Sequence, residues 1–175
     1  MIVSNMCGNI EETKKTIRMV NKSPHDMPKY ANVGDSGFDL RAWINESYKE
    51  VKKNTEGNLY IELKPLERVL IHTGIYVNLP KYTELQVRSR SGMSLKKGVI
   101  VCNTPGTVDC YYTGEVGVIL INLSNEIVEI VDGDRIAQAV LMPVFNSELT
   151  EIVKVDDLVE NNGRSSGGFG HTGFK

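Results

Sequence analysis

Short apolar runs closed by turn residues dominate this sequence, and this pattern limits the folds that it can adopt. Runs such as 59–63, 99–101 and 127–131 have the length of β-strands and are rich in Val and Ile. Nearly every run ends at a glycine, a proline or an Asp-Gly pair. Long amphipathic stretches, which would form crossover helices, do not separate the runs. The pattern predicts an all-β sandwich or barrel rather than a βαβ fold.

Two segments depart from the strand pattern. Residues 93–97 lack strand alternation and precede Gly98, a residue suited to a helix C-cap. We therefore expect one short helix that begins near Ser91. Residues 45–58 are charged and only weakly periodic, which predicts a solvent-facing loop.

Composition excludes several classes of protein. The 175 residues include 20 basic and 22 acidic side chains, so the net charge of −2 argues against stable nucleic-acid binding. Any bound anion must be held by local positive charge. Three cysteines, an odd number without CxxC spacing, exclude a disulfide scaffold and argue against structural zinc. No apolar run is long enough to cross a membrane and the start does not resemble a signal peptide, so we expect a cytoplasmic protein.

The chain is expected to have three parts. Residues 1–14 predict a loose N-terminal extension, residues 15–159 the β domain, and residues 160–175 a flexible Gly-rich tail. Such a tail is most often a disordered end. However, Arg164, Phe169 and Thr172 lie among residues that impose little steric cost, so the tail is able to close as a lid over a ligand that has a flat ring and phosphates.

Three further segments carry candidate chemistry beside plainer interpretations. Residues 87–97 form a basic turn or, with Ser91 and Gly92 beside Arg90, an anion site. Residues 103–114 predict a hairpin with Asp109 near its end, either as a turn former or as a carboxylate that polarises a water. Residues 35–39 and 133–138 are weaker signals, interpreted as a turn and as a strand opening with a pair between Asp134 and Arg135.

In chain order, these segments resemble the five motifs of the homotrimeric dUTPase family, which hydrolyses dUTP to dUMP and pyrophosphate. The matching segments are 37–42, 90–96, 103–115, 133–138 and 164–173. Five motifs in the family's order make the resemblance specific. It implies a β jelly-roll or distorted-barrel subunit with one short helix. Three such subunits would form a homotrimer whose active sites lie at subunit junctions and combine motifs from three chains.

The resemblance also implies a role for each matching residue. Asp109 would be the catalytic residue that holds the attacking water, and Asp39 would act on Mg²⁺ through a water. Uracil would be bound by Asn103, Gly106, Thr107 and Val108, and the sugar by Tyr112 and Asp109. The phosphates would be bound by Arg90, Ser91, Gly92 and Gln138. In the tail, Arg164, Gly170 and Thr172 would close on the phosphates and Phe169 would stack on uracil.

The sequence departs from the family pattern at three positions: Ser89 replaces a common proline, Ser165 a common glycine and His171 a common serine. Two alternatives stay open. A dCTP deaminase would need a glutamate three residues before Asn122, where Ile119 stands. A nucleotide sensor with a partner-binding role would use the same fold, and the 45–58 loop would be the segment to carry that role.

Overall fold

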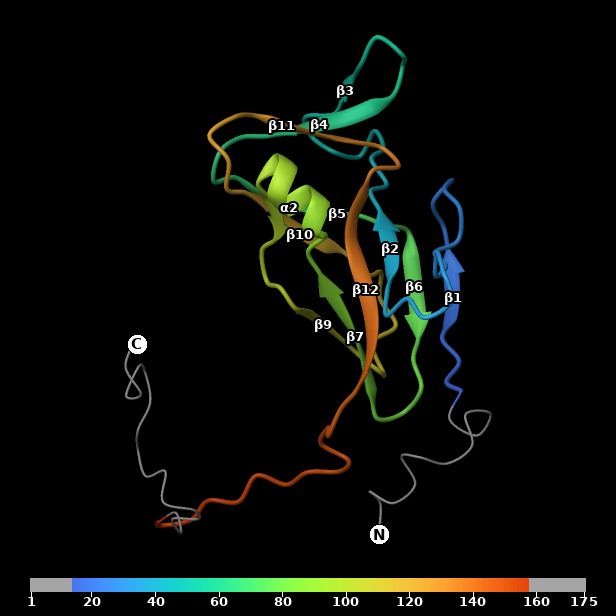
Figure 1. The fold of residues 1–175 in the computed structure, drawn as a ribbon, viewed down its shortest axis with the longest axis vertical. Coiled ribbons are helices and arrows are strands. Elements are labelled where there is room, and N and C mark those ends of the chain that lie inside the picture. The colour runs from blue at the N-terminus through green and yellow to red at the C-terminus, as the bar shows by residue number, and fades with distance from the viewer. Residues whose placement is uncertain (1–13, 158–175) are drawn as a thin grey trace. The chain divides into compact units, whose positions relative to one another are not determined.

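Short antiparallel strands build residues 14–144 of the computed structural model, which describes residues 14–157 (Figure 1). The sequence prediction of an all-β fold with one short helix is confirmed. The elements of this part are β1 (Arg18–Asn21), β2 (Phe38–Arg41), β3 (Lys52–Lys53), β4 (Leu59–Leu63), β5 (Arg68–Ile71), β6 (Ile75–Asn78), β7 (Thr83–Arg88), α2 (Ser91–Lys97), β8 (Val99–Val101), β9 (Gly106–Asp109), β10 (Val118–Asn122), β11 (Val128–Val131) and β12 (Arg135–Pro143).

Four antiparallel sheets result from the pairing of these strands. The largest has the order β2-β12-β7-β9, and two three-stranded sheets have the orders β5-β10-β8 and β11-β4-β3. A two-stranded ribbon pairs β1 with β6. β12 runs between β2 and β7 and joins segments that are far apart in sequence (Figure 1).

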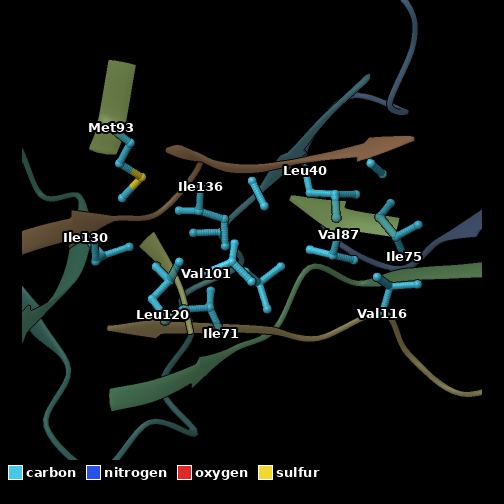
Figure 2. Packing of buried hydrophobic residues seen from close by; sticks show 14 of the residues in the cluster. Leu40, Ile71, Ile75, Val87, Met93, Val101, Val116, Leu120, Ile130 and Ile136 are labelled. Carbon is cyan, nitrogen blue, oxygen red and sulfur yellow. The ribbon is translucent and has the colours of Figure 1, made fainter. Parts of the chain in front are cut away.

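Alternation along the strands separates an apolar interior from a polar exterior. In β7, Thr83, Leu85 and Val87 are buried while the residues between them are partly exposed. Leu40 and Ile136 of the four-stranded sheet and Leu120 of sheet β5-β10-β8 contribute to the same core cluster (Figure 2). Burial of these side chains is the main stabilising term for the fold. The outward positions of the same strands are thereby left for polar side chains.

The one helix in residues 14–157 forms where the sequence predicts it. α2 begins at Ser91 and ends before Gly98, which has a φ of 66° and donates its N–H to the Ser94 carbonyl at 3.2 Å. A Cβ at Gly98 would lie 2.9 Å from the Ser124 Cβ, so glycine is required here for packing as well as for its φ. The Ser89 hydroxyl accepts the Val101 N–H at 2.9 Å and ties the start of the helix to β8.

Three strand assignments differ from the sequence interpretation. The predicted hairpin at 103–114 is wrong, because β9 pairs along its whole length with β7 and not with a strand of its own segment. The interpretation of residues 35–39 as a turn is only partly right, since Phe38 already belongs to β2. The 45–58 loop is mostly exposed as predicted, yet Lys52–Lys53 forms β3 and pairs with β4.

Residues 145–157 belong to a second unit of the chain. A turn at Asn146, whose carbonyl accepts the Leu149 and Thr150 N–H groups, is its main regular feature. Apolar side chains on this segment are exposed, Ile152 fully so. The predicted domain boundary at 159 and most of the predicted extension lie outside the described residues. Within residues 14–157, no helix is long and apolar enough to cross a membrane.

Asn122 provides a test of this packing, because its side chain is fully buried and holds three segments together. Its Nδ2 donates to the carbonyls of Leu63 at 2.8 Å and Glu126 at 2.7 Å, and its Oδ1 accepts the N–H and hydroxyl of Ser124. We predict that Asn122→Ala lowers the free energy of unfolding by about 3 kcal/mol, because buried carbonyls lose their donors. Urea unfolding measures this change.

The exposed neighbour Asn125 offers the matched control, and Asn125→Ala should change the free energy of unfolding by less than about 0.5 kcal/mol. Equal unfolding midpoints for the two variants would contradict the prediction.

Candidate active site

A row of polar side chains crosses the outer face of the four-stranded sheet. Gln138 of β12 lies in register with Asp39 of β2 on one side and with Arg88 of β7 on the other. Directly paired residues of neighbouring strands point to the same face. All three are partly exposed, whereas the adjacent Leu40 and Val87 are buried. The strand register therefore gathers polar side chains that are far apart in sequence.

Two arginines hold the Asp39 carboxylate in this row. Arg90 Nε donates to Asp39 Oδ1 at 2.7 Å and Nη2 to Oδ2 at 3.4 Å, while Arg135 Nη1 donates to Oδ2 at 3.2 Å. Arg90 also donates to the Arg135 carbonyl at 2.9 Å. Two guanidinium groups around one carboxylate leave a net positive charge, which favours anion binding.

The predicted pair between Asp134 and Arg135 is wrong. Arg135 reaches across to Asp39, and Asp134 Oδ2 instead accepts the Val131 N–H at 3.1 Å and lies 4.0 Å from Lys97 Nζ. Asp134 precedes β12, whereas Arg135 is the first residue of that strand and its side chain lies beside Asp39 of β2.

Gln138 links this row to the beginning of α2. Its Nε2 donates to the Ser89 carbonyl at 3.0 Å. Ser91 and Gly92 open the helix, where the first backbone N–H groups have no intrahelical acceptor. A Cβ at Gly92 would meet no atom within 4 Å, so the backbone there faces open space. The structure thus brings together Arg90, Ser91, Gly92 and Gln138, as the sequence predicts for a phosphate cradle.

A second group of predicted residues surrounds a pocket of about 270 Å³ at the end of β9. Thr107, Val108, Asp109 and Tyr112 line it. β9 is an edge strand of its sheet, so one row of its backbone polar groups does not face β7.

Asn103 lies at the other end of this strand. A Cβ at Gly106 would lie 3.2 Å from Asn103 Nδ2, so glycine gives the amide room beside the backbone. The side-chain amide and the edge of β9 therefore present hydrogen-bonding groups side by side.

Tyr112 lines the pocket, and two hydrogen bonds hold it in place. Its N–H donates to the Asp109 carbonyl and its hydroxyl to the Glu115 carbonyl, each at 3.0 Å. A Cβ at Gly114 would lie 2.5 Å from Tyr112 Cζ, so only glycine leaves space for the phenol.

Glu115 also lines this pocket, although no sequence motif assigns it a role. Burial raises the pKa of its carboxyl, but hydrogen bonds from Gly74, His72 and Thr73 outweigh burial and hold the pKa below the usual value. The carboxylate therefore stabilises the fold above its unfolded-state pKa, and this contribution is lost as the pH falls through the lower folded-state pKa.

The cradle and the pocket lie far apart within one chain. Asp109 and Met142 are both in register with Glu84, and Gln138 lies four residues from Met142 along β12. Strand geometry places Asp109 about 13 Å along and about 10 Å across the sheet from Gln138, or about 16 Å in all. Asp109 and Gln138 of one chain are therefore too far apart to contact the same phosphate group.

The predicted lid residues Arg164, Phe169, Gly170 and Thr172 lie outside the described residues. In the described part of the chain, strand pairing decides which side chains meet, and the sequence does not reveal that pairing. Arg135 and Glu115 have acceptors or donors that no short motif reveals, since their partners are more than 40 residues away in sequence.

Comparison with known proteins adds independent findings. A family model described as dUTPase matches residues 23–173. A deoxyuridine 5'-triphosphate nucleotidohydrolase of Finegoldia magna is 43% identical over 158 residues, covering 90% of this chain and 99% of the relative.

Solved structures agree on the fold. A mutant of the dUTPase of Staphylococcus bacteriophage 80alpha, with dUpNHpp, superposes with a TM-score of 0.71 at 23% identity, covering 90% of this chain and 98% of the other. A mutant dUTPase from phage phi11 of S. aureus, described with a structural Mg(II) ion, has a TM-score of 0.63 at 22% identity and covers 81% of this chain and 97% of the other. The expected β jelly-roll subunit is thereby confirmed. The family model and the Finegoldia magna relative, which both match most of the chain, show that the chain belongs to the dUTPase family.

Proposed function

We propose that this chain is a dUTP diphosphatase, which uses a water molecule to split dUTP into dUMP and pyrophosphate. The observation that carries the proposal is the pocket at the end of β9, where Asp109 and Tyr112 lie beside an exposed strand edge. The relative that matches along nine tenths of the chain is named for this same reaction. Such an enzyme supplies dUMP and keeps uracil out of DNA.

Uracil would be recognised by the free edge of β9 together with Asn103. Backbone N–H and C=O groups of Gly106, Thr107 and Val108 alternate donors and acceptors, as does the O2, N3–H and O4 edge of uracil. Cytosine would oppose a donor with its amino group and leave a desolvated polar group unpaired. Selection for uracil then follows from fixed backbone geometry.

The sugar and the reacting water would lie next to this strand. Tyr112 packs against deoxyribose and leaves no room for a 2'-hydroxyl, while Asp109 meets the 3'-hydroxyl and holds the water in line with the α-phosphorus. Asp109 is exposed at the end of β9 and opens into the pocket, which suits a carboxylate that must accept a proton from water.

The phosphates would be held by the cradle of a second subunit. Arg90 donates in a fixed orientation because Asp39 holds its guanidinium, and the backbone of Ser91 and Gly92 adds N–H donors beside Gln138. These donors neutralise the charge that develops on the leaving pyrophosphate. From the sequence, Arg164, Gly170 and Thr172 of the tail would close on the phosphates and Phe169 on uracil.

Magnesium fits the residues that are present. Within residues 14–157, no cluster of three His, Cys, Asp or Glu side chains forms a protein cage for a metal. Mg²⁺ prefers phosphate oxygens and retained waters, so a triphosphate and one carboxylate are a suitable donor set. Asp39 would hold it through a water, since the carboxylate keeps acceptor capacity beside its two arginines. Bound Mg²⁺ would neutralise phosphate charge and orient the chain of phosphates.

A homotrimer is the assembly that this arrangement favours. The separation of Asp109 from Gln138 supports a site to which two chains contribute, and the family resemblance adds the third chain. The outer face of sheet β5-β10-β8 is apolar and exposed at Leu70 and Ile119, which pair in register, and such a face fits a contact between subunits. The cytoplasmic location expected from the sequence remains a prediction.

The two alternatives have less support. Ile119 lies on this apolar face of β10, where a deaminase would need an acid, so proton transfer to cytosine has no side chain to perform it. A sensor without catalysis would have no need for Asp109 in the pocket. We therefore favour hydrolysis of dUTP.

Replacing Asp109 by alanine should reduce kcat for dUTP by at least about 1,000-fold, because the attacking water loses its base and its position. Pyrophosphate release with Mg²⁺ is measured for dUTP, UTP, dTTP and dCTP. The wild type should prefer dUTP strongly. Glu129→Gln, which neutralises an exposed carboxylate on β11, should keep wild-type kcat. An Asp109→Ala enzyme with full activity would disprove the proposed role.

Mixed trimers would test whether sites are shared. Asp109→Ala and Arg90→Ala chains are each expected to be inactive alone. If acid and cradle come from different chains, random mixing at equal amounts should restore about a quarter of the sites, since each site draws the two parts independently. Unfolding the two variants together and refolding them, followed by the activity assay, measures this recovery. Absence of recovery in refolded trimers would show that each site belongs to one chain.

A further inference from the structure

We infer that Glu115 is a positioning residue that fixes Tyr112 against the sugar and so sets the discrimination between dUTP and UTP. This inference rests on the proposed function and names the group behind its sugar selectivity. It also gives a role to Tyr48, in the 45–58 loop, which the proposed mechanism does not use.

The Glu115 side chain is anchored on the connection between β5 and β6. Its Oε1 accepts the N–H groups of Thr73 at 3.0 Å and Gly74 at 2.7 Å, and its Oε2 lies 2.9 Å from His72 Nδ1. Three contacts to one carboxylate leave it little rotational freedom. The backbone of the following residue is held as well, because Val116 N–H donates to the Ile75 carbonyl at 2.8 Å.

The backbone of Glu115 connects its anchored side chain to the pocket through a contact with Tyr112. Its carbonyl accepts the Tyr112 hydroxyl at 3.0 Å, and the missing side chain at Gly114 lets the phenol lie over the turn. Tyr112 is 46% exposed, so core packing alone does not fix its ring. The hydroxyl bond is therefore the contact that keeps the ring in one place.

Tyr48 supports the same anchor from the other side. Its hydroxyl accepts the backbone N–H of His72 at 2.7 Å, and its ring contacts the His72 imidazole edge-on with centroids 5.6 Å apart. Burial raises the pKa of Tyr48, more than the His72 hydrogen bond lowers it, and the hydroxyl stays protonated. The loop that the sequence marks as exposed thus contributes one half-buried side chain to the support of His72.

The inferred chain of contacts has a measurable consequence. A ring free to swing would admit a 2'-hydroxyl, so loss of the anchor should favour UTP relative to dUTP. Thermal stability alone would not produce this change in ratio. The ratio of kcat/KM for dUTP to kcat/KM for UTP is therefore the decisive readout.

Glu115→Ala should lower this ratio at least about tenfold. Glu115→Gln should keep it within about twofold, because its carbonyl oxygen still accepts both N–H groups and its amide donates to Nδ1 of the other His72 tautomer. The matched control is Glu62→Ala, which removes a carboxylate bound to Lys52 at 2.6 Å on β4 and should leave the ratio unchanged. An unchanged ratio in a folded Glu115→Ala enzyme overturns the inference.

Tyr112→Phe covers the case in which Glu115→Ala does not fold. This variant removes only the hydroxyl of an exposed side chain and should also lower the ratio. If Tyr112→Phe keeps the wild-type ratio, the hydroxyl bond does not set sugar selectivity and the inference fails. A wild-type enzyme that does not hydrolyse dUTP would instead overturn the proposed function, so the two failures are distinguishable.

Discussion

The register of β12 between β2 and β7 is the constraint on which the phosphate cradle depends. It places Gln138 opposite Asp39 and Arg88, and it leaves Ala137 and Ala139 facing the core. A slip of one residue would turn Gln138 inward and an alanine outward. The large apolar side chains of the interior resist such a slip, since each would move to solvent. The strand register that buries the core is thus the same register that positions the residues of the cradle.

The pocket depends on a different property, the position of β9 at the edge of its sheet. Pairing with β7 fixes one side of this strand and, within residues 14–157, leaves its other side without a paired strand, as the proposed uracil site needs. Glycine serves twice here, at Gly106 beside Asn103 and at Gly114 beneath Tyr112. Gln138 of the cradle and Asp109 of the pocket belong to the same sheet, and they lie apart because they are near opposite ends of its strands.

Prediction from sequence succeeded where one local pattern decides the structure. Strands such as β4 and β8 were found because apolar runs between turn residues need no distant partner to be recognised. β2 and β9 were missed because polar residues alternate with their core residues, so neither strand forms an apolar run. The partner of Arg135 and the role of Glu115 were missed for another reason. Their contacts join segments that only the folded sheet brings together, and backbone N–H donors leave no mark on a sequence.

The exposed edge of β9, which we propose binds uracil, is also open to any other extended chain. Sheet proteins commonly guard such edges with lysine or proline inside the strand, but here a proline would remove a backbone N–H from the proposed uracil site. β9 contains neither. Its four residues are short for templating a foreign strand, and the carboxylate at its end repels acidic ones. The short length of β9 and the charge of Asp109 are therefore the features that oppose pairing of a foreign strand at this edge.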